Sequence, residues 1–115
     1  MEKFDQLRQK IVRFRDDRDW KQFHQPKDMA LSLVLEAAEV LELFQWQREH
    51  EMDELLKTKR EQLEDELADV LFWVVLMAND FGIDLFESVE RKLEKTALKY
   101  PVEKARGTRK KYTEL

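Results

Sequence analysis

The sequence predicts an all-α fold. Apolar residues recur every three or four positions along most of the chain, which is the period of a helix. No run of alternating polar and apolar residues suggests a strand. Only two glycines and two prolines interrupt the 115 residues, so each turn can be located separately. We therefore expect one domain over residues 1–115, with four bundled helices and a basic C-terminal tail from about residue 101.

The first helix is predicted before Pro26. Its apolar stripe, at helical spacing, consists of Phe4, Leu7, Ile11 and Phe14. Pro26 suits the first position of a second helix, because the N–H that proline lacks would be unpaired there.

The next 55 residues must contain a break. From Lys27 to Phe81 there is no Pro or Gly, and one helix of that length would span roughly 80 Å. We expect the break in the polar stretch 47–59, and the third helix to end at Gly82.

The fourth helix is predicted between residue 84 and Pro101. Asp84 and Glu87 resemble a capping box at its start. The side chains expected to point inward are Phe86, Val89, Leu93 and Ala97.

Composition excludes several classes of protein. With no cysteine, the chain has no disulfide, thiolate zinc site or cysteine nucleophile. A net charge of −4, with basic residues gathered only near the end, argues against nucleic-acid binding. The longest apolar stretch, 67–78, is too short for a membrane span, and the first residues lack a signal peptide's apolar region. We expect a soluble, cytoplasmic protein with neither nucleic acid nor membrane as a partner.

The predicted second helix is apolar on nearly every side. Its polar exceptions between residues 30 and 44 are Ser32, Glu36, Glu39 and Glu42. At about 100° per residue, the first three of these share an arc of roughly 60°. In a chain this small, we expect a partner subunit to supply part of the burial of such a helix.

The predicted third helix repeats this pattern. Asp69 is the only polar residue between Leu67 and Ala78, and Glu66 and Trp73 lie about one turn away on the same side. Two helices thus each present a carboxylate pair in apolar surroundings. Neither 30–44 nor 66–81 contains a Lys or Arg to pair with them.

A divalent cation would resolve this concentration of negative charge. Burying an unpaired carboxylate is costly, and four together repel one another. Protonation, by raising their pKa values, would relieve only part of the cost. Oxygen ligands without Cys or His favour Mg²⁺, with Mn²⁺ as the alternative, over Zn²⁺. A lone pair at this spacing is usually a solvated face, which is our interpretation of Glu61 and Glu64.

Such a metal points to a phosphorylated substrate, because Mg²⁺ held by carboxylates keeps positions for water and phosphate oxygens. Two glycines cannot build a Gly-rich phosphate loop, so basic side chains would supply further phosphate contacts. The candidates are Lys92, Lys95, Lys99, Arg109, Lys110 and Lys111. A nucleobase stacks well on aromatic rings. The candidates for that contact are Trp20, Phe23, His24, Trp46 and Trp73.

Several motifs, in order, resemble those of a known family. Glu36-Ala-Ala-Glu39 followed by Glu66-Leu-Ala-Asp69 is similar to the E-x-x-E…E-x-x-D signature of the MazG-like all-α nucleoside triphosphate pyrophosphohydrolases. Flanking motifs, from about residue 4 to the C-terminus, narrow the resemblance to the dCTP pyrophosphatase branch. They are Arg18-Asp19-Trp20, Gln22-Phe23-His24-Gln25-Pro26, Glu42-Leu43-Phe44-Gln45-Trp46 and Lys111-Tyr112-Thr113-Glu114-Leu115.

The resemblance implies a bundle-like MazG fold, assembled as a homodimer or homotetramer. It also implies Mg²⁺-dependent hydrolysis of a (deoxy)nucleoside triphosphate, such as dCTP, to the monophosphate and pyrophosphate. The metal ligands would be Glu36, Glu39, Glu66 and Asp69. The nucleotide-binding positions would be Trp20, Lys21, Gln22, Phe23, His24, Trp46, Trp73, Lys111 and Tyr112. We assign Glu39 the catalytic role of orienting or deprotonating the attacking water.

Ile11, Trp73 and Thr96 differ from residues common in that branch, and these differences bear on base preference rather than on the chemistry. Two other functions stay open. One is a non-enzymatic helical interaction module, whose carboxylates form a hydrogen-bond network across a dimer. The other is a pyrophosphohydrolase of a neighbouring branch, acting on dUTP or a phosphoribosyl nucleotide.

Overall fold

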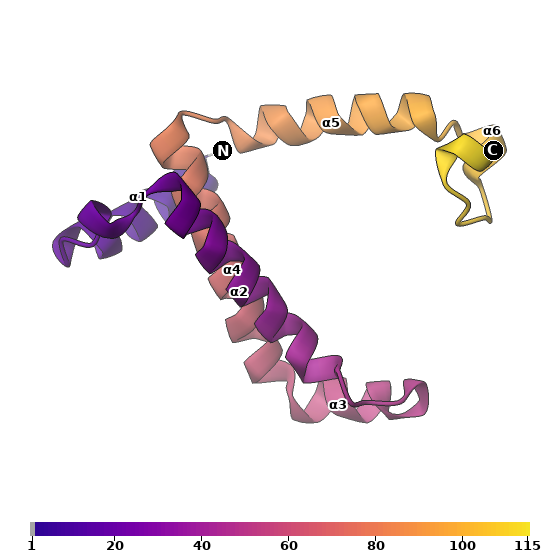
Figure 1. Ribbon diagram of the computed structural model, residues 1–115, viewed down its shortest axis with the longest axis horizontal. Coiled ribbons are helices and arrows are strands. Elements are labelled where there is room, and N and C mark those ends of the chain that lie inside the picture. The colour runs from indigo at the N-terminus through magenta and orange to yellow at the C-terminus, as the bar shows by residue number, and fades with distance from the viewer. Residues whose placement is uncertain (1) are drawn as a thin grey trace. The chain divides into compact units, whose positions relative to one another are not determined.

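The computed structural model describes residues 2–115, and its regular elements over this range are all helical (Figure 1). The predicted all-α class is confirmed. The α-helices are α1 (Glu2–Asp17), α2 (Pro26–Phe44), α3 (Met52–Thr58), α4 (Arg60–Phe81), α5 (Leu85–Lys99) and α6 (Val102–Ala105). Short 3₁₀ helices are η1 (Lys21–Phe23), η2 (Glu49–Glu51) and η3 (Tyr112–Glu114).

The helices group into two compact units, which divide between Phe81 and Gly82. The first, described over residues 2–81, holds α1 to α4, and the second holds α5 and α6. The expectation of a single domain stays a prediction. No helix within residues 2–115 combines the length and the apolar character needed to cross a membrane.

The predicted helix ends are confirmed at three positions. Pro26 is the first residue of α2. Gly82 follows the last residue of α4 with a φ of 68°, a left-handed conformation that glycine adopts without strain. Asp84 caps α5, because its side-chain Oδ1 accepts a hydrogen bond from the Glu87 backbone N–H at 3.1 Å.

The expected number of helices is wrong: four were predicted, and residues 2–115 contain six α-helices. The polar stretch 47–59 holds η2 and α3 rather than only a break, since Leu55 is buried and packs with Phe44 and Leu63. The expected basic tail likewise contains α6 and η3. Short helices of this kind depend on a few packing contacts, which a polar composition conceals.

In the first unit, α2 and α4 lie antiparallel and side by side, connected through η2 and α3 (Figure 1). Helix α1 packs against α4. The buried apolar side chains are Met29, Leu55, Val75, Leu76 and Ala78. Most of this small core lies where the start of α2 meets the last turns of α4. The middle of the α2–α4 pair, which carries the predicted carboxylates, lies beside it.

The outer face of α2 is open to solvent in the single chain. Leu31 is 51% exposed, and Val34, Leu35 and Leu41 are each 64% exposed. The expectation that a partner subunit supplies part of the burial of this helix stays a prediction. Within the described part of the first unit, α4 is the helix that packs most extensively on α2.

In the second unit, the tail folds back on the end of α5. The rings of Tyr100 and Tyr112 meet edge to face with centroids 5.9 Å apart, and the Lys99 amine lies 4.8 Å from the Tyr112 ring centre. The apolar side chains expected to point inward from α5 are exposed in the single chain, so that expectation is wrong there. They are Phe86, Val89, Leu93 and Ala97.

Candidate active site

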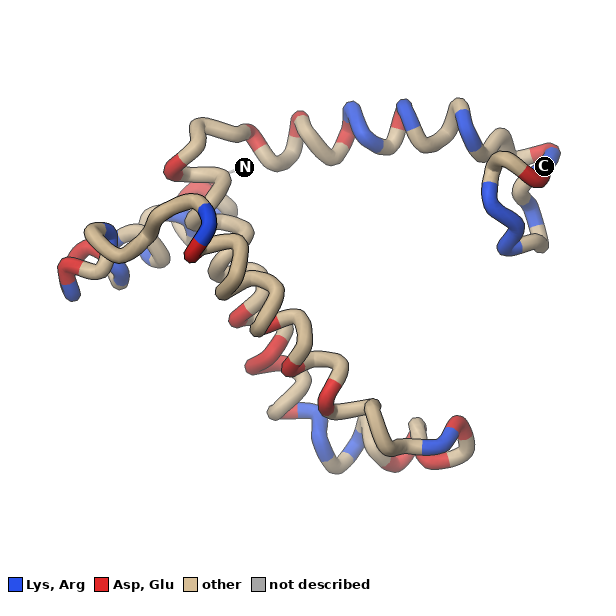
Figure 2. Tube along the Cα trace, viewed as in Figure 1, with Lys and Arg blue, Asp and Glu red and all other residues tan. Residues whose placement is uncertain are grey.

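Four carboxylates converge midway along the α2–α4 pair. Because the helices are antiparallel neighbours, the α2 pair, Glu36 and Glu39, lies opposite the α4 pair, Glu66 and Asp69. One oxygen from each of the four lies within 4.8 Å of the others. Figure 2 shows acidic segments on both helices along this stretch. The geometry is the one that the two sequence pairs predicted.

This cluster is electrostatically unsatisfied. Glu36 Oε2 and Glu66 Oε2 are buried and have no hydrogen-bond partner within residues 2–115. Burial and then the carboxyl groups of Glu39 and Asp69 raise the pKa of Glu36. Hydrogen bonding with Glu39, followed by burial and the neighbouring charges, raises the pKa of Glu66 to about 7. Carboxyl groups this close share protons unless a cation takes the protons' place.

The residues fit a hard divalent cation. All four ligand atoms are carboxylate oxygens, which Mg²⁺ and Mn²⁺ prefer. The two buried oxygens without a donor within residues 2–115 are a second observation consistent with a site that could hold a cation. No ion pair joins any of the four to a Lys or Arg among the pairs formed by residues 2–115.

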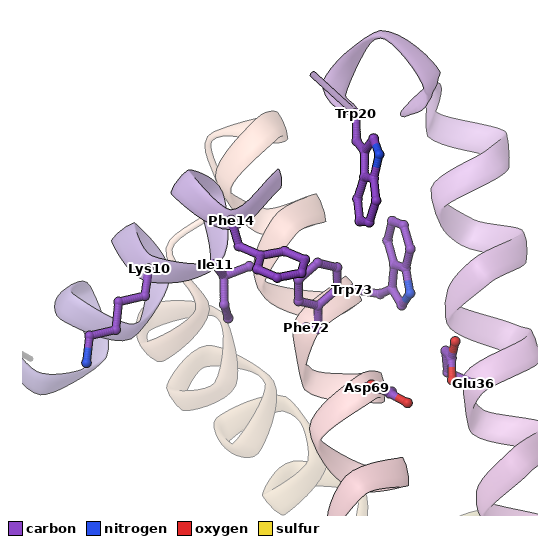
Figure 3. Close-up of a pocket in the computed structure, with 8 residues that line it drawn as sticks. All are labelled: Lys10, Ile11, Phe14, Trp20, Glu36, Asp69, Phe72 and Trp73. Carbon is purple, nitrogen blue, oxygen red and sulfur yellow. The ribbon is translucent and has the colours of Figure 1, made fainter. Parts of the chain in front are cut away.

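A cavity of about 530 Å³ opens beside the cluster (Figure 3). Glu36 and Asp69 belong to both the cavity wall and the carboxylate cluster, so the two features form one site. Trp73, one turn beyond Asp69, lies between the carboxylates and Trp20. The lining residues are Lys10, Ile11, Phe14, Trp20, Glu36, Asp69, Phe72 and Trp73. The volume lies within the usual range for small-molecule sites.

Aromatic rings form a continuous wall along this cavity. Phe14 meets Trp20 and Phe72 edge to face, at centroid distances of 5.8 and 6.1 Å. Phe72 in turn meets Trp73 at 5.4 Å. The Arg18 guanidinium lies 3.8 Å from the centre of the Phe14 ring. Such a wall presents flat apolar surface on which a planar ring can stack.

The rings of His24 and Trp73 meet edge to face, with centroids 5.0 Å apart. Its Nδ1 is buried and has no partner within residues 2–115. Burial, and then the positive charge of Arg15, lower the pKa of His24, so its neutral form is favoured. His24 supports the pocket through Trp73 and is not one of the residues that line it.

The sequence analysis found the pocket only in part. It selected Trp20 and Trp73 as nucleotide contacts, and both line the cavity. Ile11 and Phe14 were predicted only as part of the apolar stripe of the first helix, with Ile11 also bearing on base preference, and no role was predicted for Lys10 or Phe72. Their helical spacing was the available signal, but periodicity does not show whether a buried stripe faces a core or a cavity.

Other predicted nucleotide contacts lie outside the cavity lining. Trp46 is 82% exposed, two residues beyond the end of α2, and Phe23 is 64% exposed. Lys21 is exposed, and Gln22 uses its side-chain amide to donate to Asp19 at 3.0 Å. Lys111 and Tyr112 belong to the second unit.

The chain can be compared with known proteins. A model of the MazG-like family matches residues 31–115, and the chain belongs to that family. Over 95% of its length it is 39% identical to dCTP pyrophosphatase 1 of Bos taurus, and 40% identical to that of Homo sapiens. It spans just under two thirds of these relatives, 66% and 65% of their lengths.

A solved structure agrees. The chain is similar to a pyrophosphatase from Archaeoglobus fulgidus DSM 4304, with a TM-score of 0.82 and 39% sequence identity. The match covers 85% of this chain and 92% of that one. The family that the sequence motifs indicated, and the MazG-like fold that it implied, are therefore confirmed.

Proposed function

We propose that this protein hydrolyses (deoxy)nucleoside triphosphates, dCTP or a related nucleotide, to the monophosphate and pyrophosphate with Mg²⁺ as cofactor. One observation carries the proposal: four converging carboxylates share Glu36 and Asp69 with an aromatic cavity large enough for a base and its sugar. Similarity to proteins named dCTP pyrophosphatase 1 and pyrophosphatase supports the reaction class.

The two halves of the site suit the two halves of a nucleotide. Glu36, Glu39, Glu66 and Asp69 would hold Mg²⁺, which when bound neutralises phosphate charge and lowers the pKa of water. The rings of Trp20 and Trp73 would hold the base, and Trp73 lies about one helical turn from Asp69. A substrate spanning both would bring its α–β phosphate bridge toward the acidic end.

Hydrolysis at that bridge needs a base as well as a metal. Water adds to a phosphorus of the α–β bridge, the bond to the bridging oxygen breaks, and pyrophosphate separates from the monophosphate. Glu39 and Asp69 are exposed while Glu36 and Glu66 are half-buried, and of the two exposed carboxylates we assign Glu39 to orient the attacking water or accept its proton.

We propose further nucleotide contacts outside the cavity. They are Lys21, Gln22, Phe23, His24, Trp46, Lys111 and Tyr112. Loss of substrate affinity in single alanine variants is the test of each. His24 is the best supported, because it packs on Trp73 and keeps a buried ring nitrogen free of protein partners within residues 2–115.

We also propose that the protein assembles as a homodimer or homotetramer. The outer face of α2 supports this, since Leu31, Val34, Leu35 and Leu41 are all more than half exposed. Light scattering coupled to size-exclusion chromatography measures the mass. Val34→Glu should shift an oligomer toward the monomer, and a monomeric wild type would contradict the assembly.

The test of function is a panel of deoxynucleoside triphosphates, with Mg²⁺ and pyrophosphate as the readout. We expect release well above that of Glu39→Gln for at least one base. The panel also separates dCTP from dUTP preference. If no triphosphate gives more pyrophosphate than the variant, the enzymatic proposal is wrong, and the interaction module becomes the better interpretation.

A further inference from the structure

A buried ion pair joins α1 to α4, and the proposed reaction gives it no role. The Arg15 side chain on α1 is 1% exposed, and its Nη1 donates to Asp80 Oδ2 on α4 at 2.7 Å. Its Nε also donates to Asp16 Oδ1 at 3.0 Å. Burial opposes the charge on Arg15, but these hydrogen bonds outweigh it and raise the pKa of the guanidinium.

The pair is a strong attachment between two helices. Burial tends to raise the pKa of Asp80, but hydrogen bonds from Arg15 and Asn79 more than compensate and lower it, so the carboxylate stays charged. A buried pair of this kind brings little net stability relative to apolar side chains. It does fix the relative position of the two segments that it joins, and each of these segments carries a residue that lines the cavity.

On the α1 side, the pair is connected directly to Trp20. The Arg15 backbone carbonyl accepts hydrogen bonds from the N–H groups of Arg18 and Trp20, both at 3.2 Å. Asp19, between them, has a φ of 54°, which turns the chain sharply after α1. The side chain of Arg15 is thus held by α4 while its main chain holds the turn that presents Trp20.

On the α4 side, the pair is connected to Trp73. Asp80 lies seven residues, or about two helical turns, beyond Trp73, so both project from the same side of α4. A single rigid path therefore runs from Trp20 through Arg15 and Asp80 to Trp73. The two indoles line the same cavity (Figure 3).

We propose that Arg15, through its ion pair with Asp80, is a positioning residue that sets the separation of Trp20 and Trp73 for the nucleobase. The inference rests on the proposed function, since it assigns the base to these two rings. Arg15 lines no part of the cavity and touches no substrate. Its effect falls on nucleotide affinity and not on the carboxylates.

The chain offers a matched control for a merely structural role. Arg8, two turns before Arg15 on α1, donates to Asn79 Oδ1 at 2.9 Å, so it ties the same two helices together. Arg8 reaches the ion pair only through Asn79, whose side-chain amide donates to Asp80 Oδ1 at 3.2 Å, and no hydrogen bond within residues 2–115 joins Arg8 to the turn that carries Trp20. If attachment of α1 is all that matters, Arg8→Met and Arg15→Met will behave alike.

The experiment compares wild type, Arg15→Met, Asp80→Asn and Arg8→Met with dCTP, or with the triphosphate that the wild type hydrolyses fastest. Assays are run at a temperature where circular dichroism shows each variant folded. We expect Arg15→Met to raise KM about tenfold while kcat changes less than about twofold. Asp80→Asn should follow in the same direction, and Arg8→Met should leave KM within about twofold.

A second readout avoids both the metal and the chemistry. The matching monophosphate, measured by calorimetry without Mg²⁺, should bind Arg15→Met about tenfold more weakly and Arg8→Met normally. The Mg²⁺ concentration for half-maximal activity should be the same in these variants as in the wild type.

Equal effects of Arg15→Met and Arg8→Met on KM and monophosphate affinity, or a loss confined to kcat, would overturn the inference. An inactive wild type would instead overturn the proposed function. If Arg15→Met does not fold, the same comparison of KM and monophosphate affinity is made between Asp80→Asn and Arg8→Met.

Discussion

The first unit has charged groups among apolar ones in two regions. In one region the charges are paired, and in the other they are not. Near the end of α4, Arg15 and Asp80 neutralise each other at 2.7 Å. Midway along the same helix, Glu66 and Asp69 meet Glu36 and Glu39 with no cation from the chain within residues 2–115. Both arrangements bring charge out of water, at a cost. Only the first is complete without a ligand.

This difference indicates which charges serve structure and which serve binding. A protein that needed only to attach α2 to α4 could have used an ion pair or apolar side chains. An uncompensated acidic cluster lowers stability, so its presence beside a cavity indicates that something outside the chain completes it. Variants should therefore respond with opposite signs in the two regions.

The largest effect on stability should come from the complete pair. Arg15→Met removes the guanidinium that pairs with Asp80, whose side chain is only 12% exposed. The variant should therefore reduce the free energy of unfolding by about 3–5 kcal/mol. Urea denaturation measures it. Arg15→Met combined with Asp80→Leu should recover most of the loss. If Arg15→Met alone were as stable as the wild type, the ion pair would not be what joins these helices.

In the carboxylate cluster, a substitution should reduce activity without reducing the stability of the metal-free protein. Glu66→Gln should lower Mg²⁺-dependent pyrophosphate release about a hundredfold or more, because a metal ligand is lost. At pH 8 without metal, the same variant should be at least as stable as the wild type, since repulsion is relieved. Glu64→Gln is the control: Glu64 lies on the same helix in an exposed pair with Arg60. A metal-free Glu66→Gln less stable than the wild type would contradict the comparison.

Metal should stabilise the folded protein. Mg²⁺ at about ten times its Kd adds about 1.4 kcal/mol when it binds only the folded state. We expect a rise of the wild-type Tm by roughly five degrees or more, and no rise for Glu66→Gln. Sodium chloride at matched ionic strength excludes a general salt effect. An equal rise in both proteins would remove the support for a specific site.

The same cluster should also make the stability of the metal-free protein depend on pH. Without metal, the raised pKa of Glu66, about 7, means that the folded state keeps a proton that the unfolded state loses near pH 4.5. Stability from this group is therefore present at low pH and lost as pH rises through 7. Glu36 acts in the same direction, whereas the lowered pKa of His24 has the opposite sign, with stability lost as pH falls below about 6.5.

The pH measurement is therefore a difference between wild type and Glu66→Gln. Thermal melts in a metal chelator, from pH 5 to pH 8, should show a wild-type decline that the variant lacks in part. Saturating Mg²⁺ should reduce the wild-type decline, because the metal replaces the proton. Parallel curves for the two proteins would show that Glu66 titrates near its ordinary pKa.

Local chemistry made several features of this chain predictable. The period of apolar residues indicated the long helices, and Pro26, Gly82 and Asp84 marked their ends where the structure has them. The two carboxylate pairs could be found because acidic residues in otherwise apolar helices are costly and so carry information. Each of these signals lies within a few residues along the chain.

What depended on contacts between distant residues could only come from the tertiary structure. The packing of α1 on α4 places Phe14 and Trp20 beside Trp73, and it buries Arg15 against Asp80, 65 residues away. In the sequence, Arg15 is one of many charged residues on a polar-rich helix. A side chain's role there is decided by what the opposing helix presents to it, and periodicity along one helix does not contain that information.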